Sequence, residues 1–317
     1  MLRRAMAVVT LFAMLVLGAC AFPVRNAAVP PHLEGRAVPA GLKGVRYVVG
    51  NEQDMQRLRG DVADTWTRER AWLLSQGLSD KLPPSNLLAL SGGGDKGAFG
   101  AGLLNGWSAT GKRPEFLLVT GISTGALIAP FAFLGPAYDK KLKDFYTNTT
   151  RADLIRARSL LSALTNDALA DTWPLRALLS KQIDRAFLDA IAVEYLKGRE
   201  LWVSTTNLDA DRRVIWNMTR LASSQDPRAL DLFLDVIMAS ASIPGAFPPV
   251  MINVEVEGKA YQEMHVDGGA TAQVFVYPPS VDLANLAKAR DGERQRTLYV
   301  IMNARLDPGW ADTERRT

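Results

Sequence analysis

Thr120-Gly121-Ile122-Ser123-Thr124-Gly125 is the stretch that decides the fold of this 317-residue chain. It contains a G-x-S-x-G pattern between the apolar run 116–119, typical of a buried strand, and the apolar segment 124–133, typical of a helix. In that context the glycines permit a tight, strained turn that projects the Ser123 hydroxyl above a sheet, at a helix N-terminus. The sequence therefore predicts a serine placed to attack a carbonyl carbon.

A glycine-rich segment precedes this turn, in the stretch LALSGGGDKGAFGAGLL of residues 88–104. Gly92, Gly94 and Gly97 fit G-x-G-x-x-G after an apolar strand, a spacing that also occurs in dinucleotide-binding folds. Such a fold places an acidic residue roughly 20 residues beyond the glycines to hold the ribose. Here the next strand ends in the Ser123 turn instead, so dinucleotide binding is disfavoured.

The order of predicted elements indicates an α/β fold. Apolar runs alternate with helical patterns, which favours a mostly parallel central sheet flanked by helices. We expect strands at 86–91, 116–119, 201–207, 213–218 and 297–303, and helices at 54–76, 97–107 and 124–133. The region 153–196 carries apolar clusters in a polar background, and either a mobile cap over an acyl chain or ordinary packed helices would fit it.

The general base is expected to be a carboxylate. The chain has two histidines: His32 lies in a proline-rich stretch, and His265 comes two residues before Asp267 instead of after an acid, as an α/β-hydrolase triad requires. Asp267 ends an apolar stretch and is followed by Gly268 and Gly269, which permit close backbone approach. Alone, this motif would be a plain turn. His265 is interpreted as a structural residue, with tuning of Asp267 or substrate contact as the alternative.

Together, GGGDKG at 92–97, GISTG at 121–125, MASASIPGAFPPV at 238–250 and DGG at 267–269 resemble, in this order, the patatin-like phospholipases. The resemblance covers roughly residues 87–276. It implies a three-layer α/β fold and a Ser-Asp dyad formed by Ser123 and Asp267. An oxyanion hole would come from Gly92, Gly93 and Gly94, with the N–H groups of Gly93 and Gly94 as donors.

The remaining motif residues are expected to support this site. Gly97, Gly121, Gly125, Gly268 and Gly269 complete the motifs, and Asp95 is expected to be a loop residue. Lys96 would order the glycine loop or favour an anionic head group, unless it is simply a solvated lysine. Ser240 and Ser242 are interpreted as packing residues that terminate a helix, not as competing nucleophiles. No cofactor is implied, and the chain has no clustered His/Cys set for a metal.

The N-terminus resembles a bacterial lipoprotein signal. Arg3 and Arg4 precede thirteen uncharged, mostly apolar residues and the box Leu17-Gly18-Ala19-Cys20, a layout too short for a comfortable span. We expect a signal peptide at 1–19, a spacer lipidated on Cys20 at 20–45, an N-terminal helical extension at 46–84 and the catalytic domain at 85–317. An ordinary secreted protein with a chance cysteine is the alternative. Lipidation would tether the chain to a membrane surface of the bacterial cell envelope.

Composition adds limits to these expectations. The chain is 48% hydrophobic and 22% charged, enough for a substantial core. Its formal charge of +4 is spread without a basic run, which disfavours nucleic-acid binding. No terminal helix is apparent after the late strand, so a C-terminus shorter than in the family is a further expectation. The function predicted is a serine lipid acyl hydrolase or carboxylesterase, and a non-catalytic lipid- or partner-binding lipoprotein is the alternative.

Overall fold

The computed structural model describes residues 25–148, 156–157, 170–171, 173–278, 281 and 294–304. The signal peptide expected at 1–19, Cys20 and about a third of the 153–196 region lie outside the described residues. Strands are β1 (Val38–Pro39), β2 (Arg46–Val48), β3 (Ser85–Leu90), β4 (Leu118–Gly121), β5 (Arg156–Ala157), β6 (Ala170–Asp171), β7 (Glu200–Asn207), β8 (Arg212–Asn217), β9 (Val250–Val256), β10 (Lys259–Asp267) and β11 (Arg296–Ile301). Helices are α2 (Glu52–Ser75), α3 (Gly97–Ala109), α4 (Thr124–Leu134), α5 (Asp139–Thr147), α8 (Trp173–Gln182), α9 (Arg185–Leu196), α10 (Met218–Ala222) and α11 (Arg228–Ser240). Short 3-10 turns are η1 (Pro31–Arg36), η2 (Gly94–Lys96), η3 (Pro136–Tyr138) and η4 (Gly268–Ala270).

One mixed sheet organises the fold, with the order β1-β9-β10-β7-β4-β3-β11 and with β8 joining β7 to β2. Its centre is parallel, since β11 pairs with β3, β3 with β4 and β4 with β7 in one direction. The outer pairs β7–β8 and β9–β10 are antiparallel. Tight turns join them, and a chain that reverses directly must run antiparallel to itself.

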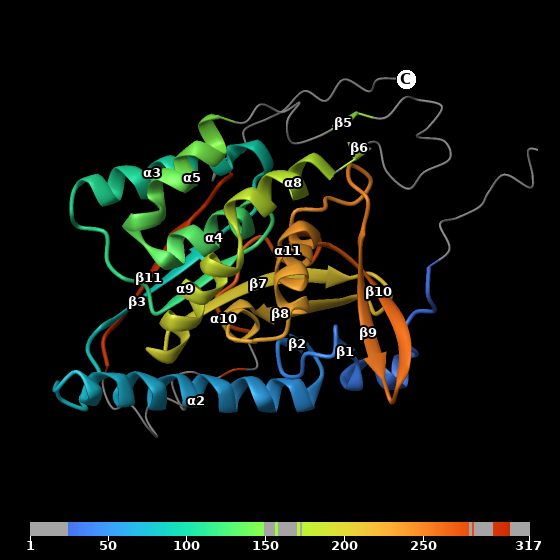
Figure 1. The fold of residues 1–317 in the computed structure, drawn as a ribbon, viewed down its shortest axis with the longest axis horizontal. Coiled ribbons are helices and arrows are strands. Elements are labelled where there is room, and N and C mark those ends of the chain that lie inside the picture. The colour runs from blue at the N-terminus through green and yellow to red at the C-terminus, as the bar shows by residue number, and fades with distance from the viewer. Residues whose placement is uncertain are drawn as a thin grey trace, which may run out of the picture.

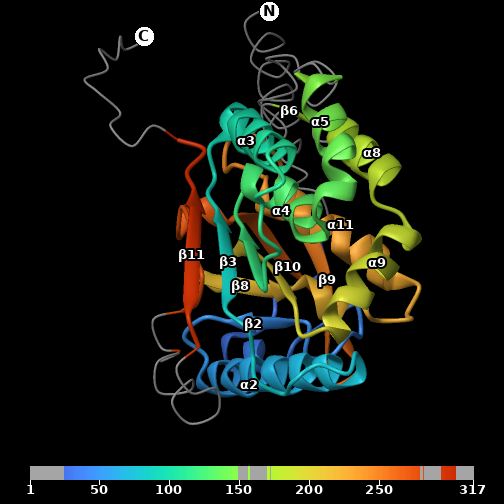
Figure 2. The same ribbon diagram turned by 90° about the vertical axis from the view of Figure 1, so that its left-hand side faces the viewer.

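Helices and an apolar segment cover the two faces of this sheet. Alternate side chains of one strand serve opposite faces, so Leu88 and Leu90 join one core and Leu87 the other. The first core packs α3, α4, α5, α9 and α11 against the strands; Figure 2 shows α3, α5, α8 and α9 on one side of β11 and β3. The second core contains apolar side chains of α2 and of the segment 272–281. These layers form the three-layer α/β fold that was expected.

The expected spacer is partly structured. Within its described part, β1 pairs with β9, and Val29, Leu42 and Val45 are buried in the first core. The next strand along the chain, β2, pairs with β8 of the same sheet (Figure 1). The described part of the expected spacer therefore packs on the folded body, because apolar side chains between the prolines give the segment enough surface to bury.

Candidate active site

Ser123 lies in the sharp turn that the G-x-S-x-G pattern predicts. β4 ends at Gly121 and α4 begins at Thr124, and Ser123 between them adopts φ 55° and ψ −126°. A non-glycine residue there is strained, and such strain is concentrated at functional sites. A Cβ on Gly121 would lie 2.5 Å from the Gly125 carbonyl oxygen, and one on Gly125 would lie 2.4 Å from that of Leu90. Both glycines are thus required by close backbone contact.

Asp267 reaches the same place from the opposite direction. β8 occupies one edge of β7, and both β4 and β10 lie along the other edge. β4 runs parallel to β7 and ends opposite Val203, whereas β10 runs antiparallel and ends opposite Thr205. The carboxyl ends of the two strands therefore meet head-on beside Ser204. This arrangement brings Ser123 and Asp267 together although 144 positions separate them.

The two side chains form a buried pair. The Asp267 carboxylate accepts a hydrogen bond of 2.6 Å from the Gly269 N–H, and the neighbouring Ser123 hydroxyl favours its charged form. Ser123 is 6% exposed and Asp267 is 4% exposed. Burial raises the pKa of Asp267, and the Ser123 hydroxyl and the Gly269 N–H oppose that rise only in part. A carboxylate with a raised pKa, in contact with a hydroxyl, is suited to accept that hydroxyl's proton.

The glycine loop between β3 and α3 faces the serine. Gly92, Gly93 and Gly94 line a cavity of about 420 Å³ with Ser123 and Asp267. The N–H of Gly92 donates to the Gln273 carbonyl at 3.0 Å, so this N–H is not available as an additional oxyanion donor. Among the described residues, no hydrogen-bond acceptor contacts the N–H of Gly93 or Gly94. These two N–H groups therefore stay the candidate oxyanion donors.

Supporting motif residues set the distances between the loops. A Cβ on Gly97 would lie 1.9 Å from the Thr124 hydroxyl oxygen, so Gly97 allows α3 to begin against α4. A Cβ on Gly268 would lie 2.4 Å from the Ser204 carbonyl oxygen, so only glycine permits the turn after Asp267. Lys96 is exposed at the end of η2. Asp95 is an exposed residue of the same short turn, as expected.

Ser240 holds the serine turn, a role the sequence analysis missed. It ends α11 and is fully buried. Its hydroxyl accepts from the Ser123 N–H at 3.0 Å and donates to the Ser204 carbonyl at 2.8 Å. Ser204 lies on β7 between the residues that pair with β4 and those that pair with β10. The Ser240 hydroxyl therefore provides the hydrogen-bond donor that the Ser204 carbonyl lacks at this gap in the sheet. Ser242 differs, because its hydroxyl bonds only its own helix, at the Met238 carbonyl.

Asn303 fixes the glycine loop from a distant part of the chain. This buried residue follows β11, and its N–H donates to the Ser91 hydroxyl at 2.8 Å. Its side chain donates to the Ser91 carbonyl and accepts from the Gly100 N–H. A Cβ on Gly93 would lie 1.8 Å from the Asn303 carbonyl oxygen. No local pattern marks Asn303, since its partners are more than 200 residues away.

His265 belongs to a separate buried network. Its Nδ1 lies 2.8 Å from the Thr205 hydroxyl, to which Trp216 donates, and its Nε2 lies 3.1 Å from Glu263. Glu263 is also paired with Arg46. Burial lowers the pKa of His265, and an imidazole that donates through Nε2 and accepts at Nδ1 satisfies every partner. Both ring nitrogens are thus engaged away from Ser123, which favours the structural interpretation.

Other sequence expectations lie elsewhere or outside the described residues. His32 is exposed in η1. In the part of the 153–196 region that is described, α8 and α9 pack through Leu179, Phe187 and Leu188 into the first core, as ordinary helices do. In the part of the chain that the structure describes, no helix is long and apolar enough to cross a membrane. No group of three His, Cys, Asp or Glu side chains gathers among these residues as around a metal ion.

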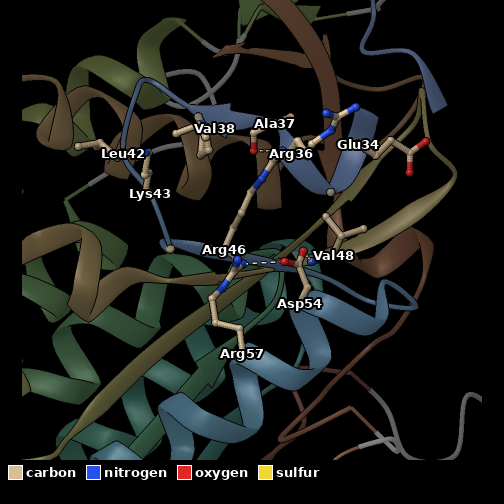
Figure 3. Close-up of a pocket in the computed structure, with 13 residues that line it drawn as sticks. Glu34, Arg36, Ala37, Val38, Leu42, Lys43, Arg46, Val48, Asp54 and Arg57 are labelled. Carbon is tan, nitrogen blue, oxygen red and sulfur yellow. Dashed lines mark hydrogen bonds and ion pairs between the residues drawn. The ribbon is translucent and has the colours of Figure 1, made fainter. Parts of the chain in front are cut away.

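A second hollow, of about 200 Å³, lies between the N-terminal segment and α2 (Figure 3). Its arginines are already paired within the fold. Arg57 binds Asp54 at 2.7 Å, and Arg46, besides its pairing with Glu263, donates to the Ala37 carbonyl at 3.2 Å. These contacts attach the N-terminal segment to the sheet, and the hollow contains none of the predicted site residues.

The sequence and the fold were compared with known proteins. A family model described as patatin-like phospholipase matches residues 88–278, more than half of the chain. Among solved structures, VipD from Legionella pneumophila is similar with 15% sequence identity and a TM-score of 0.40, over 70% of this chain and 50% of VipD. The chain thus spans about half the length of that protein. No curated protein matches the sequence. By this sequence match over residues 88–278, the chain belongs to the patatin-like phospholipase family.

Proposed function

We propose that the protein is a serine lipid acyl hydrolase that cleaves ester bonds of lipids, phospholipids included, through an acyl-enzyme on Ser123. The observation that carries this proposal is the placement of two buried side chains, Ser123 on a strained turn and Asp267, in one cavity, where Ser123 influences the pKa of Asp267. Membership of the family supports a lipid substrate. The apolar side chains Ile243, Pro244 and Ala270 in the cavity are compatible with one.

The proposed reaction has two halves that use the same groups. Asp267 accepts the hydroxyl proton of Ser123 while the Ser123 Oγ forms a bond to the ester carbon. The carbonyl oxygen becomes an oxyanion, which is bound by the N–H groups of Gly93 and Gly94. The carbon–oxygen bond to the alcohol then breaks as Asp267 returns the proton to that oxygen. In the second half a water gives its proton to Asp267 and attacks the acyl carbon. Ser123 leaves with the proton, and the fatty acid is released.

Labelling with a fluorophosphonate probe, read by mass spectrometry, tests the dyad. We expect probe mass on the peptide that contains Ser123 in the wild-type protein, and much less in Asp267→Asn. Ser123→Ala is the matched control, and circular dichroism verifies that all three are folded. A folded wild-type protein that stays unlabelled would contradict the proposal. The non-catalytic binding protein would then become the better account, supported if Ser123→Ala and wild type bind lipid vesicles equally.

We also propose, from the residues of the N-terminus alone, that Cys20 is lipidated and tethers the protein to the bacterial cell envelope. Detergent-phase partition and mass spectrometry of the mature N-terminus test this step. Full-length protein should enter the detergent phase with an acylated N-terminal cysteine, and Cys20→Ser should remain in the aqueous phase. An unmodified N-terminus in the wild-type protein would refute the anchor and leave the hydrolase proposal intact.

A further inference from the structure

The cavity that contains the dyad offers few polar side chains to a substrate. Among the described residues that line it, glycines, alanines and the apolar Ile243 and Pro244 make up most of the wall. Three of these lining residues carry a polar side chain: Ser123, Asp267 and Gln273. The first two are assigned to bond formation and proton transfer. Gln273 is therefore the one remaining side chain of this described wall that can form a hydrogen bond with a bound ester.

The backbone at Gln273 is held in place by the elements around the site. The Gln273 carbonyl accepts from the Gly92 N–H at 3.0 Å, which ties this residue to the start of the glycine loop. Two residues later, the Phe275 carbonyl accepts from the hydroxyl of Thr120 on β4. Neither contact involves the Gln273 side chain. The position of this residue in the cavity wall is thus set by the fold and does not depend on its amide group.

The side chain of Gln273 has no hydrogen-bond partner among the described residues. Gln273 is exposed, whereas Ser123 and Asp267 are buried, so Gln273 lies toward the open mouth of the cavity. A side-chain amide has two N–H donors and one carbonyl acceptor. Because its backbone is fixed and its amide is free, Gln273 can bind a ligand without breaking a contact within the fold.

The chemistry of a lipid ester limits what this amide can bind. The oxyanion has its candidate donors in the N–H groups of Gly93 and Gly94, and a fatty acyl chain has no polar atom. An amide packed against a hydrocarbon chain would lose its hydrogen bonds to water without a replacement. The alcohol part of a glycerol ester, in contrast, carries an oxygen on the carbon next to the esterified one. This oxygen, as a hydroxyl or as a second ester, can accept a hydrogen bond from the amide.

The charge of the cavity favours an uncharged partner. Asp267 is the one ionisable side chain among the described residues that line it, and none of these residues is basic. Asp267 must be deprotonated to act as the base, so the active form of the cavity is negative. This charge would repel a phosphate in direct contact with the wall, whereas a hydroxyl or an ester carbonyl carries no charge. The amide therefore fits an uncharged oxygen better than a phosphate.

Resting on the proposed function, we propose that the side-chain amide of Gln273 binds an uncharged oxygen in the alcohol part of the substrate and makes the enzyme selective for esters of polyols such as glycerol. Gln273 is then a specificity residue, because an ester of a simple alcohol has no oxygen for the amide to bind. One neutral hydrogen bond should raise kcat/KM for the polyol ester by about three- to tenfold.

The test compares glyceryl monobutyrate with propyl butyrate, which share the acyl group and differ in the hydroxyl groups of the alcohol. Butyrate release is followed by titration at constant pH. Gln273→Met keeps an unbranched side chain and removes its amide. It should lower the glyceryl-to-propyl ratio of kcat/KM by about three- to tenfold. Gln56→Met is the matched control: Gln56 is an exposed glutamine of α2 that does not line the cavity, so the ratio should keep its wild-type value.

Three results would overturn this assignment, and circular dichroism verifies in each case that the proteins are folded. If Gln273→Met matches the wild-type protein on both esters, Gln273 has no role in specificity, while the hydrolase stands. An equal loss of kcat/KM on both esters shows that the amide serves the oxyanion, which both substrates form, and not the alcohol. A wild-type protein that cleaves neither ester refutes the hydrolase, and the specificity proposal fails with it.

Discussion

Replacement of Ser240 by alanine should loosen the serine turn without touching the substrate. The change removes the acceptor of the Ser123 N–H and the donor to the Ser204 carbonyl, both buried. A buried backbone group left without a partner costs about 1–3 kcal/mol. For two such groups we expect the free energy of unfolding to fall by about 2–4 kcal/mol, with a melting temperature lower by roughly 5–15 °C.

The same change should reduce catalysis through position. Ser123 would lose the contact that sets its backbone relative to β7, and a displacement of about 1 Å in a reacting group can cost about 100-fold in rate. We therefore expect kcat to fall tenfold or more with little change in KM. Denaturant titration and steady-state kinetics on p-nitrophenyl butyrate measure the two effects.

Ser242→Ala is the matched control for this prediction. Ser242 is as deeply buried as Ser240, but its hydroxyl bonds only the Met238 carbonyl one turn earlier in the chain. Its loss should cost less than about 1 kcal/mol and leave kcat nearly unchanged. Equal losses in stability and kcat for the two serines would refute the reasoning, since burial alone would then explain both.

Three other predictions concern the dyad and the glycine loop. Ser123→Gly should be more stable than Ser123→Ala by about 1–2 kcal/mol in denaturant titration, because only glycine relieves the strained turn; equal stabilities would contradict that strain. Since burial raises the pKa of Asp267, the stability that Asp267 contributes, measured as the difference between wild type and Asp267→Asn, should fall as pH rises from the unfolded-state pKa, near 3.9, through the raised value, whereas kcat/KM should increase over that range. Asp267→Asn should lose this pH dependence and be at least as stable at pH 7; a variant as pH-dependent as the wild type would show that another group titrates. Asn303→Ala should lower kcat by about tenfold or more and stability by about 2–4 kcal/mol, as it frees the Ser91 carbonyl and the Gly100 N–H; unchanged kcat in a folded variant would contradict a positioning role.

The sequence could predict the site where its chemistry is local. A turn with a strained serine needs glycine on both sides within five residues, so the pattern at 121–125 identifies it without reference to the rest of the chain. The glycine loop and the Asp267 turn are equally local. The alternation of apolar strands and helices likewise predicted the parallel centre of the sheet, with element ends displaced by a few residues: the strand expected at 116–119 is β4 at Leu118–Gly121.

Only the tertiary structure decided how these local pieces meet. The head-on approach of β4 and β10 depends on the register of both strands against β7, and register is a long-range property that no short pattern encodes. Ser240 and Asn303 contact the site from 117 and more than 200 residues away, so nothing near them in the sequence distinguishes them from packing residues. The sequence by itself determined the reactive groups and the turns that present them; the tertiary structure decided their alignment, because buried polar groups must find partners wherever the fold places them.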